Sequence, residues 1–278
     1  MIGVVDVGGG LRGAYGAGVF DWCLDNGLSF DCCVGVSAGS ANVAAYIAKQ
    51  RNRNLRFYEV YSQRSEYMGL RAMVRSRSFL SVDYVYGTLS NSAGEDPLDY
   101  QAICNSQQQF HAVATDAHTG EPVYLTLDDM GQDDYMPLKA SSAVPLACRP
   151  YKYGNHAYYD GGISDPIPLQ HAFNLGCSKV AVILTRPRDF YRDPKKDALM
   201  SSLLGVKYPR AGKALRQRAQ IYNRELDFAK EKCAEGKVLI IAPDSIGDMG
   251  TLTKDIDAIH ALYDKGYSDA KQLAEFAA

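Results

Sequence analysis

The sequence predicts an α/β fold with a mainly parallel central sheet flanked by helices. Its 278 residues, 46% of them hydrophobic, are enough to bury a large core. The first 50 residues alternate apolar runs of strand length with glycine turns and helical stretches, as in the opening units of a parallel sheet. We expect one domain over residues 1–278, because the chain has no internal repeat, low-complexity tract or long linker.

The N-terminal elements follow a strand–helix–strand–helix order. An apolar strand at 1–7 leads through a glycine turn into a helix at 14–27, and Gly27 ends that helix. A second strand at 30–36 precedes an alanine-rich helix at 37–50. Two strands connected in this way by a helix are expected to lie parallel.

The rest of the chain adds further strands and two long helices. Residues 55–89 carry irregular helical signals, and residues 110–127 predict two strands joined around a His-Thr-Gly turn. Apolar, β-branched runs predict strands at 178–186 and 236–243. Apolar residues at helical spacing predict core-facing stripes in two late helices, packed on the same core: Leu215, Ala219, Tyr222, Leu226, Ala229 and Cys233, then Leu252, Ile256, Ile259, Tyr263 and Tyr267.

Charge and composition limit the function classes. Lys and Arg total 30 against 32 Asp and Glu, so no global field favours nucleic acid. The first residues lack a positive region and no apolar stretch approaches about 20 residues, so we expect neither a secretory leader nor a membrane span. The cysteines lack metal-site spacing and predict free thiols in a reducing cytoplasm: Cys23, Cys32, Cys33, Cys104, Cys148, Cys177 and Cys233.

A glycine cluster, "GGGLRG", follows the first predicted strand. Gly8 to Gly13 satisfy the G-x-G-x-x-G fingerprint of dinucleotide sites. That fingerprint also needs an acid at the end of the second strand, whereas Asp31 stands at its beginning. Glycines beside a helix N-terminus also let main-chain N–H groups approach a ligand, so the loop predicts an anion or oxyanion cradle. A tight strand-to-helix turn would explain one or two of these glycines.

A serine between two glycines follows the second predicted strand. Gly35-Val36-Ser37-Ala38-Gly39 fits the G-x-S-x-G elbow, in which a strand turns sharply into a helix and exposes a nucleophilic hydroxyl. The helix N-terminus would stabilise negative charge that develops near Ser37. A Gly- and Ser-rich turn carries such a pattern by chance as well, so catalysis also requires a base that takes the serine proton.

Histidine does not supply that base in a recognisable pattern. The histidines lie outside catalytic-loop contexts: His111, His118, His156, His171 and His260. We expect His171 on a helix surface. The elbow also follows a single strand, whereas α/β-hydrolases place several strands before it, so that fold is a poor match.

Asp160, in "YYDGGISDPIPLQHA", offers a different base. Gly161 and Gly162 would let another backbone approach the carboxylate, although an Asp-Gly turn is the simpler interpretation of these residues alone. "GGGLRG", "GVSAGS" and "DGG", in this order, resemble the patatin-like phospholipase family, whose members use a serine–aspartate dyad without histidine. "AVATDAHTGEPVYL" and "LKASSAVPLACRPY" also look like family segments, and the resemblance covers roughly residues 1–185.

The resemblance implies a three-layer α/β/α fold and hydrolysis of lipid carboxylic esters, of the phospholipase A or lysophospholipase type, through an acyl-enzyme. It implies Ser37 as nucleophile and Asp160 as general base, without metal or cofactor. The implied oxyanion site comprises Gly8, Gly9, Gly10, Arg12 and Ala38. Further motif positions are Gly13, Gly35, Gly39, Gly161 and Gly162. For Arg12 we favour a structural role in the loop over contact with a lipid phosphate.

Other functions stay open at this point. The chain could be a non-catalytic lipid-binding or regulatory protein of the same fold, or a nucleotide-binding protein that uses the glycine cluster. A general carboxylesterase or an acyl-thioester hydrolase is chemically adjacent to the leading hypothesis. Acyl length, headgroup and oligomeric state carry no sequence signal.

Residues 49–77 suggest contact with a membrane surface. They hold eight Lys and Arg against two Glu, with Phe57, Tyr58, Tyr61 and Tyr67 interleaved. A basic, aromatic surface suits anionic lipid headgroups at the inner face of a membrane. A solvated helical region is the alternative interpretation.

Overall fold

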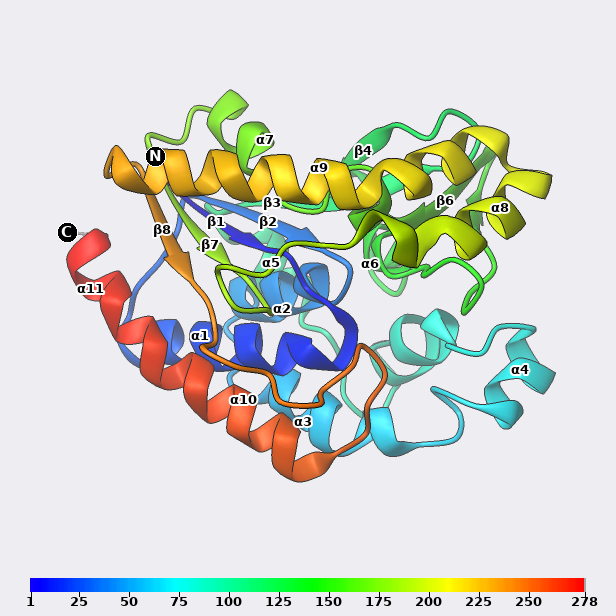
Figure 1. The fold of residues 1–278 in the computed structure, drawn as a ribbon. Helices are drawn as coiled ribbons and strands as arrows, with labels where there is room; N and C mark the ends of the chain where they lie inside the picture. The colour runs from blue at the N-terminus through cyan, green and yellow to red at the C-terminus, as the bar shows by residue number, and fades with distance from the viewer. Residues whose placement is uncertain (278) are drawn as a thin grey trace.

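The structure, a computed structural model, describes residues 1–277, in which one eight-stranded sheet is covered by helices on both faces (Figure 1). The strands are β1 Ile2–Asp6, β2 Cys32–Val36, β3 Gln109–Asp116, β4 Pro122–Thr126, β5 Tyr151–Tyr153, β6 His156–Asp160, β7 Lys179–Ile183 and β8 Val238–Ile241. The α-helices are α1 Ala14–Asp25, α2 Ala38–Ile47, α3 Arg53–Glu59, α4 Leu70–Ser76, α5 Tyr100–Cys104, α6 Met136–Ser141, α7 Leu169–Asn174, α8 Ala198–Lys207, α9 Pro209–Ala234, α10 Ile256–Asp269 and α11 Leu273–Phe276.

The sheet is parallel in its centre and antiparallel at one side. Its order is β5-β6-β3-β2-β1-β7-β8, and β4 pairs with β3 outside this path. The neighbours from β3 to β8 run parallel, while β4, β5 and β6 form antiparallel pairs. The expected α/β class with a mainly parallel sheet is therefore confirmed.

Each central strand buries side chains on both faces, which explains its continuous apolar sequence. Val5 and Val34 pack with α7 and α9 on one face, where Leu226 of α9 is fully buried. Val4 and Cys33 pack on the opposite face with α1, α2 and α10. Figure 1 shows α7 and α9 above the sheet and α1, α2 and α10 below it.

Most elements expected from periodicity are present. The α9 stripe faces the core as predicted, and Gly27 lies just beyond α1 with a left-handed φ of 65°. The prediction of the second stripe is wrong at its N-terminal end. Leu252 lies before α10, which begins at Ile256, and both side chains are exposed. No sequence pattern predicted α5, α6, α8, β5 or β6.

Candidate active site

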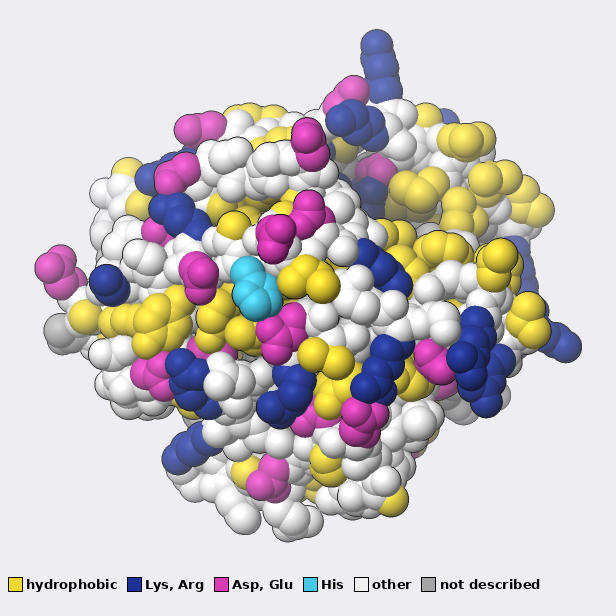
Figure 2. Space-filling view, turned by 90° about the horizontal axis from the view of Figure 1, so that it is seen from below, with side chains coloured by type: hydrophobic (Ala, Val, Ile, Leu, Met, Phe, Trp, Pro, Cys, Tyr) yellow, Lys and Arg dark blue, Asp and Glu magenta, His cyan; other side chains and the backbone are white. Residues whose placement is uncertain are grey.

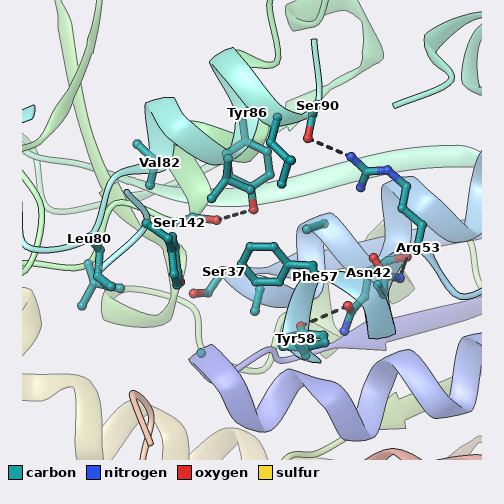
Figure 3. A pocket seen from close by; sticks show the side chains of 18 of the residues that line it. Ser37, Asn42, Arg53, Phe57, Tyr58, Leu80, Val82, Tyr86, Ser90 and Ser142 are labelled. Atoms are coloured by element: carbon teal, nitrogen blue, oxygen red, sulfur yellow. Dashed lines mark hydrogen bonds between the residues drawn. The ribbon is translucent and has the colours of Figure 1, made fainter. Parts of the chain in front are cut away.

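Ser37 sits on the sharp turn between β2 and α2. Its φ of 56° lies in the left-handed region, an uncommon conformation for a residue with a side chain. A Cβ on Gly35 would collide with the backbone of Ser40, and one on Gly39 with the carbonyl of Asp6. The glycines of the elbow are therefore required by close backbone packing, and the strained turn points the Ser37 side chain into a cavity (Figure 3).

Hydrogen bonds to neighbouring serines hold the elbow. The Ser37 N–H donates to Oγ of Ser141, the last residue of α6, at 2.8 Å. The Ser37 carbonyl accepts from Oγ of Ser40 at 2.7 Å, so Ser40 packs against the elbow. No sequence pattern pointed to Ser141, which lies about 100 residues further along the chain.

The glycine loop lies directly against this elbow. Gly8, Gly9 and Gly10 all have positive φ, at 62°, 123° and 64°. A Cβ on Gly8 would collide with the Val36 carbonyl, and one on Gly10 with the carbonyl of Thr251. All three glycines thus adopt a conformation that side chains rarely tolerate, which a simple turn would not require.

Bonds from distant segments fix the loop in place. The Leu11 N–H donates to the Thr251 carbonyl at 2.9 Å, and the Thr185 hydroxyl donates to the Gly8 carbonyl. Arg12 is buried and donates from Nη1 to Thr251 Oγ1 at 3.0 Å. The Gly8 N–H donates to Asp6 Oδ1 at 2.9 Å, so this amide is committed to the loop itself.

A buried polar network supports the loop from below. Asp6 accepts from Gly8 and also from Nδ2 of Asn42 at 2.9 Å, and the same Asn42 nitrogen donates to the Gly13 carbonyl at 3.0 Å. The Tyr58 hydroxyl donates to Asn42 Oδ1 at 3.1 Å. Burial raises the pKa of Asp6 to about 6, against the opposing hydrogen bonds from Asn42 and Gly8. One signal in the sequence could have found this network, namely an acid at the end of a strand preceding a glycine cluster.

The register of β3 brings Asp160 beside Ser37. Val36 pairs with Val113, and Asp160 pairs with Ala114, the next residue of β3. Because β4 occupies the other edge of β3, β2 and β6 must meet end to end along the same edge. The C-terminus of β6 therefore lies at the turn that carries Ser37.

The Asp160 carboxylate is buried at this junction. Its Oδ1 accepts from the Gly162 N–H at 2.8 Å, and a Cβ on Gly161 would collide with the backbone of β3. Burial raises the pKa of Asp160, while the hydrogen bond with the Ser37 side chain, the Gly162 amide and the charges of Arg218 and Arg192 lower it. The two side chains singled out in the sequence are thus in contact range.

An apolar cavity opens at Ser37. Its apolar walls come mainly from the segments between α2 and β3: Ala41, Phe57, Tyr58, Tyr67, Leu80, Val82, Val85, Tyr86 and Leu89. Figure 3 shows the Ser37 side chain among Phe57, Tyr86 and Ser142, where the Tyr86 and Ser142 hydroxyls lie 3.3 Å apart. A second, polar cavity is lined by Ser37, Asp160 and the glycine loop.

The prediction of a basic, aromatic surface over residues 49–77 is wrong about the aromatic rings. Tyr58 and Tyr61 are buried, and Phe57 and Tyr67 line the apolar cavity. Several cations in the segment are also neutralised: Arg51 by Asp25, Arg56 by Asp96, Arg64 by Glu95 and Arg71 by Glu66. Most of the segment thus serves the cavity wall and the packing around it.

His171 also differs from its expected place on a helix surface. It is half-buried and stacks on Tyr124, with ring centroids 3.6 Å apart. Burial, followed by the neighbouring His111, lowers the pKa of His171 to about 4.

All seven cysteines are free, and five of them are buried. None of the helices in residues 1–277 combines the length and the hydrophobicity that crossing a bilayer requires. The same residues contain no group of three or more His, Cys, Asp or Glu side chains placed to hold a metal ion.

Comparison with known proteins decides the family. The model of the patatin-like phospholipase family matches residues 7–173, more than half of the chain. The chain belongs to this family. The resemblance inferred from the three sequence motifs is thereby confirmed. A further family model, a domain of unknown function termed DUF6363, matches residues 208–276, which hold α9 and α10.

Two relatives extend the comparison. This patatin-like chain is 29% identical over 219 residues to the uncharacterized protein YjjU of Escherichia coli K12, covering 73% of this chain and 57% of that protein. The crystal structure of VipD from Legionella pneumophila superimposes with a TM-score of 0.48 at 11% identity, covering 98% of this chain and 66% of VipD. The chain thus spans less than two thirds of each relative.

Proposed function

We propose that the protein is a serine acyl hydrolase that cleaves lipid carboxylic esters, of the phospholipase A or lysophospholipase type, with Ser37 and Asp160 as its catalytic dyad. The observation that carries this proposal is the end-to-end meeting of β2 and β6 on one edge of β3, which brings the Ser37 elbow to the buried Asp160 carboxylate. Family membership supports the same chemistry.

The proposed reaction runs in two half-cycles. Asp160 accepts the Ser37 proton as Oγ attacks the ester carbonyl, and the tetrahedral intermediate then expels the alcohol, which takes that proton from Asp160. In the second half-cycle Asp160 accepts a proton from water as the water oxygen attacks the acyl-enzyme. Collapse releases the fatty acid and returns the proton to Ser37 Oγ.

Main-chain amides would stabilise the oxyanion. We assign this role to the N–H groups of Gly9, Gly10 and Ala38, because the Gly8 amide already donates to Asp6. The N-terminus of α2 adds its dipole at Ala38. Arg12 would stiffen the loop through its bond to Thr251.

Burial suits Asp160 to the role of base. An ordinary aspartate, with a pKa of about 3.9, is a weak base for a serine hydroxyl. Because burial raises the pKa of Asp160, its carboxylate binds the proton more tightly in the folded protein. The apolar cavity on the other side of Ser37 would hold the acyl chain, since its walls are aromatic and aliphatic.

Intact-mass analysis after treatment with a fluorophosphonate ester tests the dyad. We expect one adduct on the parent protein and none on Ser37→Ala, while the control Ser202→Ala, at an exposed site, is labelled like the parent. An unlabelled but folded parent would contradict the proposal. Lipid that co-purifies with such a protein would favour a binding role, and a thermal shift with NAD would favour the nucleotide alternative.

We also propose peripheral contact with anionic membranes through α4. Leu70 and Val74 are 81% and 83% exposed, and Arg75 and Arg77 lie on and directly after the same helix. Figure 2 shows hydrophobic side chains, with Lys and Arg around them, on the side of the molecule where α4 and α8 lie in Figure 1. Exposed apolar side chains flanked by cations fit the surface of a membrane rich in anionic lipid.

Vesicle sedimentation tests this contact. We expect vesicles with anionic lipid to retain the protein and neutral vesicles to leave it in solution. Leu70→Ser with Val74→Ser should abolish retention, whereas the control Ile256→Ser, at an exposed site on α10, should not. Equal retention by both vesicle types, or by the double variant, would contradict this part of the proposal.

The domain organisation and location belong to the same proposal. We propose that residues 1–278 act as one domain, because α9 and α10 pack on the two faces of the sheet that carries Ser37. The unpaired thiols support a reducing compartment, and we propose the cytoplasm.

A further inference from the structure

The polar cavity beside Ser37 is lined by four arginines from separate parts of the chain. Arg12 comes from the glycine loop, Arg186 and Arg192 from the segment after β7, and Arg218 from α9. The last three lie outside the residues that the phospholipase family model matches, so nothing in that match assigns them a role. Asp160 faces the same cavity.

Of these four arginines, Arg218 alone forms an ion pair with a residue in 1–277. Its Nε donates to Oδ2 of the buried Asp197 at 2.9 Å, and its Nη2 donates to Oδ1. In residues 1–277 the Nε atoms of Arg12, Arg186 and Arg192 are buried without any hydrogen-bond partner. Three guanidinium groups therefore reach this cavity with donors to spare.

Aromatic rings hold two of these guanidinium groups in place. Arg186 lies over the ring of Phe190 at 4.2 Å from its centroid, and Arg192 lies over the ring of Tyr222 at 4.7 Å. Stacking fixes the plane of a guanidinium group and leaves its edge N–H groups for a ligand. Burial, and then the charges of Arg186 and Arg192, lowers the pKa of Arg12 to about 9. The cations thus repel one another, and an anion placed between them would relieve the repulsion.

We propose that this cavity binds a phosphate group, with Arg186 and Arg192 as the specificity-determining residues and Arg12 beside them. Guanidinium groups match phosphate oxygens with paired, charge-assisted hydrogen bonds. This assignment rests on the proposed function. Because Ser37 lines both cavities, the phosphate is that of the lipid headgroup. The acyl chain then enters the apolar cavity and the headgroup enters the arginine cavity, with the ester carbonyl at Ser37 between them.

A pair of matched esters tests the assignment. The substrates are 1-acyl-glycerol-3-phosphate and the monoacylglycerol with the same acyl chain, and kcat/KM is measured for each. Arg186→Gln and Arg192→Gln should each lower the ratio of kcat/KM for the phosphate ester to kcat/KM for the neutral ester by about 10- to 100-fold, because each removes a phosphate contact that the neutral ester lacks. Arg188→Gln, at an exposed site in the same segment, is the control and should change neither. Arg186→Lys should restore part of the loss, because it keeps the positive charge.

Inorganic phosphate, titrated by calorimetry into the parent and the double glutamine variant, distinguishes the source of the phosphate. If the parent binds free phosphate and the double variant does not, but the parent has the same kcat/KM on both esters, the cavity is an anion site. Its assignment to the lipid headgroup would then be overturned. Equal losses on both esters would overturn the proposal in favour of a structural role. Neither phosphate binding nor discrimination between the esters would overturn it outright. If the proposed dyad is wrong, the parent protein will not be labelled by the fluorophosphonate. Phosphate binding is measured independently of this, because it needs no turnover.

Discussion

In the proposed reaction Asp160 is the residue on which the chemistry depends most, because its environment sets its strength as a base. It ends a short strand, lies buried, and keeps one fixed hydrogen bond, from Gly162. Ser37 reaches it from the neighbouring strand end in a strained backbone conformation. This pairing of a strained serine with a buried carboxylate would let the proposed dyad work without an imidazole.

At this scale we predict that Asp160→Asn lowers kcat by about 10²- to 10⁴-fold, the usual contribution of a general base. Burial raises the pKa of Asp160, so the base is protonated at pH values where an ordinary aspartate is ionised. The parent kcat/KM should therefore fall with decreasing pH on a limb that lies above about pH 3.9. The residual activity of the variant should lack this limb. A pH profile of both proteins measures this.

Asp128→Asn, at an exposed carboxylate, is the control and should keep the parent profile. A parent activity that is constant down to pH 4, or an Asp160→Asn variant with full activity, would exclude Asp160 as the base.

The glycine loop and the elbow act as one element, held together by the network around Asp6. Asp6 ends β1, Asn42 lies in α2, and Tyr58 lies in α3, so three elements meet beneath the loop. Glycines 8, 35 and 39 allow the backbones to touch. A buried polar network thus positions the amides to which we assign the oxyanion role.

At the scale of this element we predict that Asn42→Ala lowers the free energy of unfolding by about 1–3 kcal/mol at pH 7.5, because it removes a donor from the buried Asp6. Asp6 has a pKa of about 6 in the folded protein, against 3.8 for an ordinary aspartate in the unfolded chain. The free energy of unfolding therefore decreases as the pH rises from the lower of these pKa values through the higher one. The hydrogen bond from Asn42 lowers the pKa of Asp6. Asn42→Ala should therefore lower the free energy of unfolding more at pH 7.5, where the Asp6 carboxylate is charged, than at pH 5.

Urea unfolding at the two pH values measures the effect, and Asn105→Ala, at an exposed site, is the matched control. A deficit that is the same at both pH values would show that Asn42 acts through packing alone.

Over the whole molecule, the two C-terminal helices complete the layers that the N-terminal motifs begin. α9 covers one face of the sheet, and α10 packs against α1, the helix that follows the glycine loop. The α1–α10 contact is close because Gly266 meets the carbonyl of Tyr15. The Tyr15 hydroxyl also donates to Asp269 at 2.7 Å.

At this largest scale we predict that Gly266→Ala destabilises the protein by about 1–3 kcal/mol, since the new methyl group collides with the Tyr15 backbone and the helices must separate. Because α1 begins directly after Gly13, kcat should fall as well. Gly205→Ala, where the nearest atom would lie 4.0 Å from the new Cβ, is the control. It should be neutral or stabilising by up to about 1 kcal/mol. Thermal unfolding and ester hydrolysis measure both variants, and an unaffected Gly266→Ala would contradict this view of the interface.

Local patterns were sufficient to predict the N-terminal strands and helices, the elbow at Ser37 and the core-facing stripe of α9. Each of these depends on interactions between residues close in the chain, and periodicity and glycine spacing report such interactions directly. The tyrosines of residues 49–77 were misplaced for the opposite reason. Their spacing fits an exposed face and a cavity wall equally well, and only packing against the Ser37 elbow distinguishes the two.

By itself, the sequence determined the α/β class, the family and the two residues proposed as the dyad, because short motifs carry all three. Only the tertiary structure decided that β6 takes over the edge of β3 where β2 ends, which brings Asp160 to Ser37 across 123 positions of the chain. It also decided that Arg12, Arg186, Arg192 and Arg218 line one cavity. The physical reason is that strand register and helix packing depend on contacts distant in sequence, which no local pattern encodes.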